Sequence, residues 1–166
     1  FGNGGRDVYL IRLEGDGEES PSCDSGYVEI TDIPESVQCI DTNWDPGEDE
    51  DDPYDCTNSC FSQTDLNVLQ RFIDNSQNGI NPPSINLSPI ELGYQTWSND
   101  GRLYIFCGNG EDYIEDFEGC STDYELSGEI PSEIDELNEL RFLVIRYNQL
   151  NGEIPSQIGN LNNLFA

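Results

Sequence analysis

The sequence has no histidine, no lysine and no methionine, and its six basic residues stand against 34 acidic ones. Without histidine, serine–histidine and cysteine–histidine catalysis and imidazole metal sites are excluded. A formal charge of −28 makes nucleic acids and anionic membranes poor partners, because like charges repel. No run of about 18 apolar residues is present, so no insertion into a membrane is expected. These absences predict a protein that is not an enzyme.

The six cysteines are an even number in a chain of 166 residues, which is typical of a disulfide framework. Such frameworks form in oxidising compartments, so we expect an extracellular or cell-surface protein. One disulfide is predicted to close the short loop between Cys107 and Cys120, and two more are expected among the other four cysteines. The cysteines are Cys23, Cys39, Cys56, Cys60, Cys107 and Cys120.

A motif recurs in the C-terminal part of the chain. The stretch Leu126–Ile134 (LSGEIPSEI) returns 24 positions later as Leu150–Ile158 (LNGEIPSQI). Between the copies, Leu143 and Ile145 alternate with outward residues, as in a short strand with one buried face. Asn148 follows this strand and is placed to satisfy backbone groups where the chain turns.

This pattern resembles the plant-type, extracellular leucine-rich repeat. The resemblance implies an α/β solenoid, in which a short leucine-rich repeat stack follows a helix-containing N-terminal cap with cysteines. It also implies a scaffold that binds other proteins through the strand face and its flanking loops. On this chain, that interaction face includes Phe142, Val144, Arg146 and Tyr147, and packing against an adjacent repeat is the alternative interpretation.

A helix is predicted near the middle of the chain. Ser62 and Asp65 have the spacing of a capping box, and an amphipathic segment follows them. Its apolar face is formed by Leu66, Val68, Leu69, Phe72 and Ile73. The order of this helix, Trp97 and a strand bearing Cys107 is similar to the cap of plant-type leucine-rich repeat proteins. We expect Trp97 to be a buried cap residue rather than a platform for a ligand.

The chain is predicted to have three parts: residues 1–60, 61–120 and 121–166. The first is expected to be an acidic, β-rich region held by disulfides, the second the cap, and the third the repeats. Within the first part, short strands are predicted at 8–13, 27–30 and 37–40.

One acidic loop supplies a candidate metal site. Its alternating aspartate and asparagine residues place hard oxygen atoms on one side of a turn, as Ca²⁺ requires. The loop departs from an EF-hand, because Pro46 stands where that loop has glycine. The segment either binds Ca²⁺, the one candidate cofactor, or is a solvated acidic loop. The candidate ligands are Asp41, Asn43, Asp45, Asp49, Asp51 and Asp52.

A repeat stack leaves a last strand whose edge must be paired, covered or charged. A second copy can cover it head to tail, and the predicted strand with Val8, Leu10 and Leu13 is the candidate donor. We therefore expect a secreted, non-enzymatic leucine-rich repeat protein that mediates protein–protein contact and assembles into an extracellular fibre or surface layer. The alternative is a ligand-recognition or adhesion module of a larger, calcium-stabilised, receptor-like surface protein. Asn86, in Asn-Leu-Ser, is the candidate N-glycosylation site.

Overall fold

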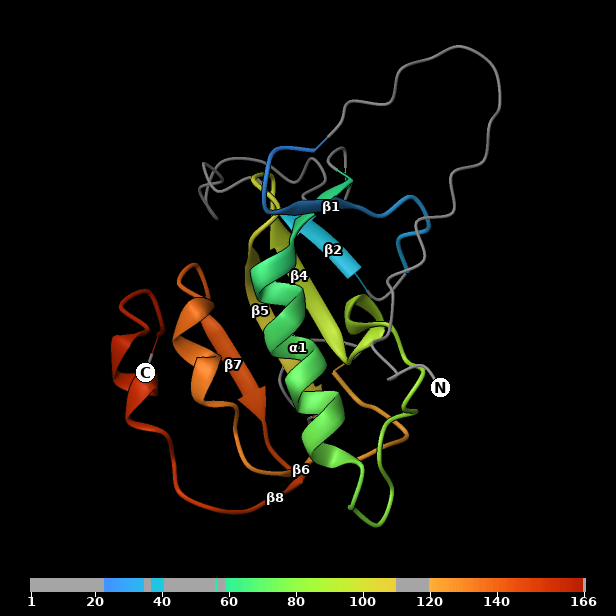
Figure 1. The fold of residues 1–166 in the computed structure, drawn as a ribbon, viewed down its shortest axis with the longest axis vertical. Helices are drawn as coiled ribbons and strands as arrows, with labels where there is room; N and C mark the ends of the chain where they lie inside the picture. The colour runs from blue at the N-terminus through green and yellow to red at the C-terminus, as the bar shows by residue number, and fades with distance from the viewer. Residues whose placement is uncertain (1–22, 35–36, 41–55, 57–58, 110–119, 166) are drawn as a thin grey trace, which may run out of the picture.

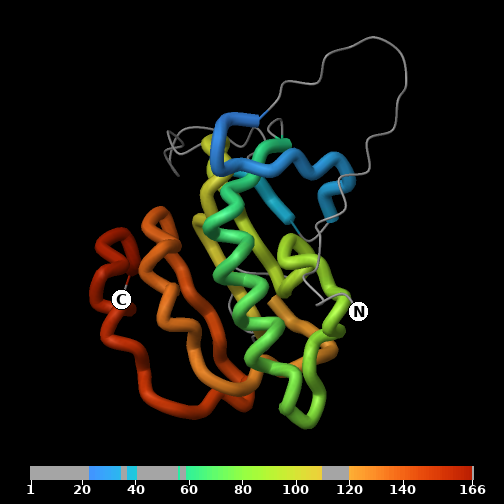
Figure 2. Tube along the Cα trace, viewed as in Figure 1, coloured from blue at the N-terminus to red at the C-terminus, as the bar shows by residue number. Residues whose placement is uncertain are grey.

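The structure is a computed structural model, which describes residues 23–34, 37–40, 56, 59–109 and 120–165. Within these ranges the chain forms one α-helix, three short 3₁₀-helices and eight strands. In Figure 1, α1 (Gln63–Ser76) lies across the central strands, and the orange and red C-terminal segments lie at one side. The tube in Figure 2 shows that these last segments run beside each other.

The central sheet has four strands in the order β2-β4-β5-β7. β2 (Val37–Ile40) is parallel to β4 (Tyr94–Ser98), which is antiparallel to β5 (Leu103–Asn109). β7 (Phe142–Ile145) is parallel to β5 and completes the sheet. Strands at the segments predicted for β2 and β7 are therefore present, but their place in one mixed sheet was not expected.

The helix predicted after Ser62 is confirmed. The Asp65 backbone N–H donates to Ser62 Oγ at 3.3 Å, so the capping residue satisfies one of the first amide groups of α1. The whole predicted apolar face is buried, and it packs in the core that α1 shares with the sheet. α1 ends at Ser76, whose hydroxyl donates to the Phe72 carbonyl at 2.7 Å and accepts from the Ser127 N–H at 2.9 Å.

Trp97 is fully buried, as predicted. Its ring meets that of Phe61 edge-on, with centroids 5.1 Å apart and planes at 84°. The Trp97 indole N–H donates to Gln95 Oε1 at 3.0 Å, and the Gln95 amide in turn donates to two backbone carbonyls. Because each polar group has a partner, this large side chain is buried without an unpaired donor.

A buried ion pair connects the start of α1 to β5. The Arg102 guanidinium donates to both carboxylate oxygens of Asp65, at 2.9 and 2.8 Å, and the Leu103 N–H donates to the same carboxylate at 2.8 Å. Asp65 has no exposed surface, whereas the Arg102 side chain is 18% exposed. The hydrogen bond to Asp65 raises the pKa of Arg102. The pair therefore fixes where the helix begins over the sheet.

The two motif copies lie parallel to each other. β6 (Ser127–Gly128) pairs with β8 (Gln149–Leu150), and the 3₁₀-helices η2 (Ser132–Glu136) and η3 (Ser156–Asn160) are in contact. Four apolar residues of the first copy and of the stretch that follows it are fully buried, while Ile130 of this copy is half-buried. The four are Leu126, Ile134, Leu137 and Leu140. Most of their counterparts 24 positions later are half-buried: Leu150, Ile158 and Leu164.

The predicted α/β solenoid with a leucine-rich repeat stack is wrong. The described residues form one α-helix and mixed sheets of two to four strands. A solenoid needs about three stacked repeats, whereas this chain has two copies of the motif, with β7 between them. The other strands of the central sheet come from segments without the motif, and β4 runs antiparallel to β5. The recurrence in the sequence therefore reflects a local pair of similar loops.

Two strands of the predicted acidic region join the rest of the fold. β1 (Tyr27–Glu29) pairs with β3 (Cys60–Ser62), directly before α1, and β2 belongs to the central sheet. Val37 and Cys39 of β2 contribute to the same hydrophobic core as the motif leucines. The division at residues 60 and 120 stays a prediction.

Candidate functional site

The outer side of β7 is the main candidate site. β7 is the last strand of the central sheet, and no strand among the described residues pairs with the side that faces away from β5. We call this side the open edge of β7. At its beginning, the Phe165 N–H donates to the Arg141 carbonyl at 2.9 Å. The chain's own Phe165 therefore occupies the beginning of this edge, and only the backbone groups beyond it are left for strand addition.

An aromatic ridge stands at the beginning of β7; we use this name for Tyr104, Arg141, Phe142 and Phe165. The Arg141 guanidinium lies 5.3 Å from the centroid of the Tyr104 ring and 5.5 Å from that of Phe165. The rings of Phe142 and Phe165 are stacked, with centroids 5.3 Å apart. Phe165 is nevertheless 59% exposed. The ridge thus presents apolar area and a positive charge together.

A second arginine–aromatic pair stands at the other end of β7. The Arg146 guanidinium lies 5.1 Å from the centroid of the Tyr147 ring, which is half exposed. Tyr147 has φ 52°, a conformation that non-glycine residues seldom adopt. Two side chains hold this turn: Asn109 donates to the Tyr147 carbonyl at 3.1 Å, and Asn148 donates to the Arg146 carbonyl at 3.0 Å. The exposed pair is therefore fixed in position.

The role predicted for Asn148 is confirmed. Besides donating to the preceding turn, its Oδ1 accepts the Leu126 N–H at 2.7 Å. It thus joins the end of β7 to the start of the first motif copy.

The arginines at the two ends of β7 differ from the other arginines that the structure describes. Arg102 is paired with Asp65, and Arg71 lies 3.8 Å from Glu133. Within the described ranges, Arg141 and Arg146 have aromatic partners and no carboxylate partner. A guanidinium over a ring keeps donors available at its rim. The open edge of β7 therefore carries local positive charge in a strongly acidic chain.

The predicted interaction face lies at this site, and sequence reasoning identified part of it. Phe142 and Val144 are half-buried on β7, and Arg146 and Tyr147 are exposed just after it. The sequence analysis missed Tyr104, Arg141 and Phe165. A signal existed for Phe165, since it follows Arg141 by the same 24 positions that separate the motif copies.

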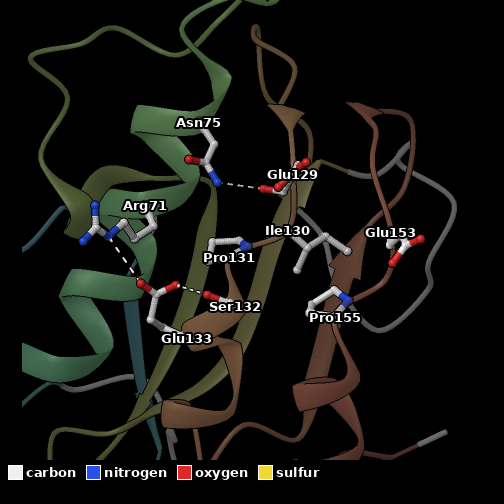
Figure 3. Close-up of a pocket in the computed structure, with 9 residues that line it drawn as sticks. All are labelled: Arg71, Asn75, Glu129, Ile130, Pro131, Ser132, Glu133, Glu153 and Pro155. Atoms are coloured by element: carbon white, nitrogen blue, oxygen red, sulfur yellow. Dashed lines mark hydrogen bonds and ion pairs between the residues drawn. The ribbon is translucent and has the colours of Figure 1, made fainter.

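A separate pocket of about 570 Å³ lies between α1 and the two motif copies (Figure 3). The Asn75 amide donates to the Glu129 carbonyl at 2.8 Å, and the Ser132 hydroxyl donates to Glu133 at 3.0 Å. Hydrogen bonds from its own backbone and from Ser132, with the nearby Arg71, lower the pKa of Glu133. These polar groups hydrogen-bond to one another and join α1 to the first motif copy along the pocket. We call this contact the seam.

Six cysteines are paired in three disulfides. Cys107 is bonded to Cys120, which is the pair expected from the sequence, and the remaining disulfides join Cys23 to Cys60 and Cys39 to Cys56. Within the described residues, no helix is long and apolar enough to span a membrane. The disulfides are consistent with an extracellular protein.

Other predicted site residues lie elsewhere. Asn86 is exposed on the loop between α1 and β4. The six candidate calcium ligands between Asp41 and Asp52, and the candidate donor residues Val8, Leu10 and Leu13, lie outside the described residues. Calcium binding and strand donation therefore stay predictions.

No protein-family model, curated protein or solved structure matches the chain. The resemblance to plant-type leucine-rich repeat proteins has no matching family to support it. Function must therefore be argued from the surface of the molecule.

Proposed function

We propose that the protein is an extracellular, non-enzymatic protein that assembles with copies of itself through the open edge of β7. That edge is the observation that carries the proposal. A strand edge presents a row of backbone donors and acceptors, which an extended segment of another chain can complete. The aromatic ridge and the Arg146–Tyr147 pair add apolar area and charge at its two ends.

The proposed contact is heterologous, because the edge that receives a strand differs from the segment that supplies it. A heterologous contact that does not close into a ring produces an open chain of subunits. Head-to-tail growth into a fibre or surface layer follows from this geometry. The three disulfides support the extracellular part of the proposal, and the lack of histidine supports the non-enzymatic part.

The test is the assembly state of the full chain over a wide range of protein concentrations. We expect the mass from light scattering to rise with concentration, and threads to be visible by negative-stain electron microscopy. A Val144→Lys variant should assemble poorly, because a charged lysine on an edge strand opposes pairing. Ile80→Lys is the matched control, since Ile80 is 87% exposed on a turn far along the chain from β7. Monomers at every concentration would contradict the proposal.

A further inference from the structure

We infer that Asn151 is a site of spontaneous covalent modification, at which its side-chain amide is converted to aspartate or isoaspartate through attack by the Gly152 backbone nitrogen. The same reaction is held back at Asn78, which also precedes a glycine. The inference concerns the chemical lifetime of the second motif copy and is independent of the proposed assembly. It is carried by exposure, backbone hydrogen bonding and packing.

The reaction needs no enzyme and no reactant other than water. The Gly152 nitrogen loses its proton to a base from the solvent and forms a bond to Cγ of Asn151. The bond from Cγ to Nδ2 breaks, and this nitrogen takes up a proton from water and leaves as ammonia. Water then adds to one of the two carbonyls of the succinimide ring and opens it to aspartate or isoaspartate. A following glycine favours ring closure, because it has no side chain to hinder the attack.

The first step is that two candidate sites share one environment. Asn78-Gly79 and Asn151-Gly152 lie wholly within the described residues, whereas the Asn-Gly pairs at 3–4 and 109–110 include residues outside them. Asn78 and Asn151 are both exposed, and both line a hollow of about 340 Å³ next to the seam. The two side chains therefore meet the same solvent, and exposure does not distinguish them.

The second step is the hydrogen bonding of the attacking nitrogen. The Gly79 N–H donates to the Ser76 carbonyl at 2.9 Å, just after the end of α1. The Gly152 N–H has no acceptor among the described residues, and the nearest ladder bond runs from the Asn151 N–H to the Gly128 carbonyl at 2.9 Å. A hydrogen-bonded N–H must be released by local opening before it can lose its proton. The nitrogen is therefore available at Gly152 and held back at Gly79.

The third step is the packing around each glycine. A Cβ atom added to Gly79 would collide with Ser127 Oγ and lie 3.1 Å from the Ser76 carbonyl oxygen, so this turn is pressed against the first motif copy. The three nearest atoms to a Cβ added to Gly152 would all belong to the Glu129 side chain, the closest at 2.8 Å. That side chain can move away. Ring closure requires the asparagine and the next peptide group to rotate toward each other, and Gly152 leaves more room for this rotation than Gly79.

Conversion changes the second motif copy in two ways. Either product adds a negative charge two residues before Glu153. Isoaspartate also inserts a methylene group into the main chain, directly after the N–H that donates to the Gly128 carbonyl. The pairing of β6 with β8 ends at this point, so the turn at Gly152 is displaced relative to the first copy.

The experiment follows both sites in the same molecule. The full chain, with its disulfides intact, is incubated in mildly alkaline buffer for several weeks, and peptide mapping by mass spectrometry measures aspartate and isoaspartate at Asn151 and Asn78. We expect Asn151 to convert at least about tenfold faster than Asn78, because local opening must precede the reaction at Gly79. In the chain reduced and unfolded in guanidinium chloride, the two rates should become similar, since neither nitrogen is then protected.

Asn151→Gln is the matched control variant, because glutamine keeps the amide but must close a less favourable six-membered ring. The variant should stay unmodified at position 151, while Asn78 converts at its wild-type rate. Equal rates at the two asparagines in the folded chain, faster conversion of Asn78, or no conversion of Asn151 would overturn the inference. A preference for Asn151 that persisted in the unfolded chain would also overturn it, because flanking sequence rather than the fold would then be the cause.

Discussion

Among single residues, Arg102 is expected to have a large effect on stability. Its guanidinium neutralises the fully buried Asp65 carboxylate. Replacing Arg102 by methionine leaves that charge without its counter-ion, so the free energy of unfolding should fall by about 3–5 kcal/mol. Urea denaturation measures the change.

Arg71→Met is the control for this prediction. Arg71 and Glu133 are 3.8 Å apart with side chains 60% and 43% exposed, and such a pair contributes about 0–1 kcal/mol. Equal losses in the two variants would show that the buried pair has no special weight.

Tyr124 is a residue through which the described part of the fold responds to alkaline pH. Burial raises the pKa of its hydroxyl above the usual 10.0, and the Gly93 N–H donates to its oxygen at 2.6 Å. A raised pKa in the folded state means that the neutral form is favoured by folding. This stabilisation is complete below pH 10 and is lost as the pH rises through the folded pKa.

We therefore expect stability to decline above about pH 10, with the phenolate absorbance of Tyr124 appearing late in the titration. Tyr124→Phe should remove part of this decline but cost about 1–3 kcal/mol at neutral pH, because the Gly93 N–H loses its acceptor. Spectrophotometric titration together with unfolding at several pH values tests both parts. An unchanged alkaline profile in the variant would count against it.

At the scale of secondary-structure elements, the contact between α1 and the motif copies can be tested with a matched pair of substitutions. Gly128 and Gly152 occupy equivalent places in the two copies and have φ 74° and 82°. Alanine at either position costs about 1 kcal/mol for this backbone conformation. At Gly128 the added Cβ also meets the Asn75 carbonyl of α1 at 2.5 Å, whereas at Gly152 it meets the movable Glu129 side chain at 2.8 Å. Thermal unfolding should show Gly128→Ala to be clearly less stable than Gly152→Ala.

Which elements could be predicted depended on how local their signals are. Ser62 and the apolar face behind it specify α1 within a few turns, and alternation specifies the strand containing Leu143 and Ile145. Strand pairing is not local. β2 pairs with β4 although more than 50 residues separate them in the sequence, and no pattern in either strand identifies its partner. The repeated motif led to the wrong prediction of a solenoid for the same reason. Two copies specify similar loops but do not determine how the remaining strands form a sheet.

At the scale of the whole molecule, the charge of −28 should control assembly. Copies repel one another over their full surfaces, whereas the proposed contact at the open edge of β7 is local. Raising the salt concentration from 10 to 150 mM shortens the screening length from about 30 to about 8 Å, which weakens the repulsion most. We therefore expect assembly to need several-fold less protein at the higher salt concentration, measured by light scattering.

The opposite result would be informative. If salt dissolved the assemblies, the local positive charge at the open edge of β7 would dominate, and replacing Arg141 and Arg146 by glutamate should then have a very large effect. Net charge and the disulfide framework were readable from composition, whereas the interaction face near β7 stays a prediction. The aromatic ridge was not readable from it, because Tyr104 and Arg141 are brought together only by the pairing of β5 with β7.

The disulfide between Cys23 and Cys60 also defines how the molecule would bear mechanical load. Tension applied to the chain ahead of Cys23 passes through this bond to Cys60, immediately before the first turn of α1. The force then enters the region secured by the Asp65–Arg102 pair and does not peel β1 away from β3. Under a reducing agent the same pull would unzip those two strands first, so tensile strength should depend on the redox state of the surroundings.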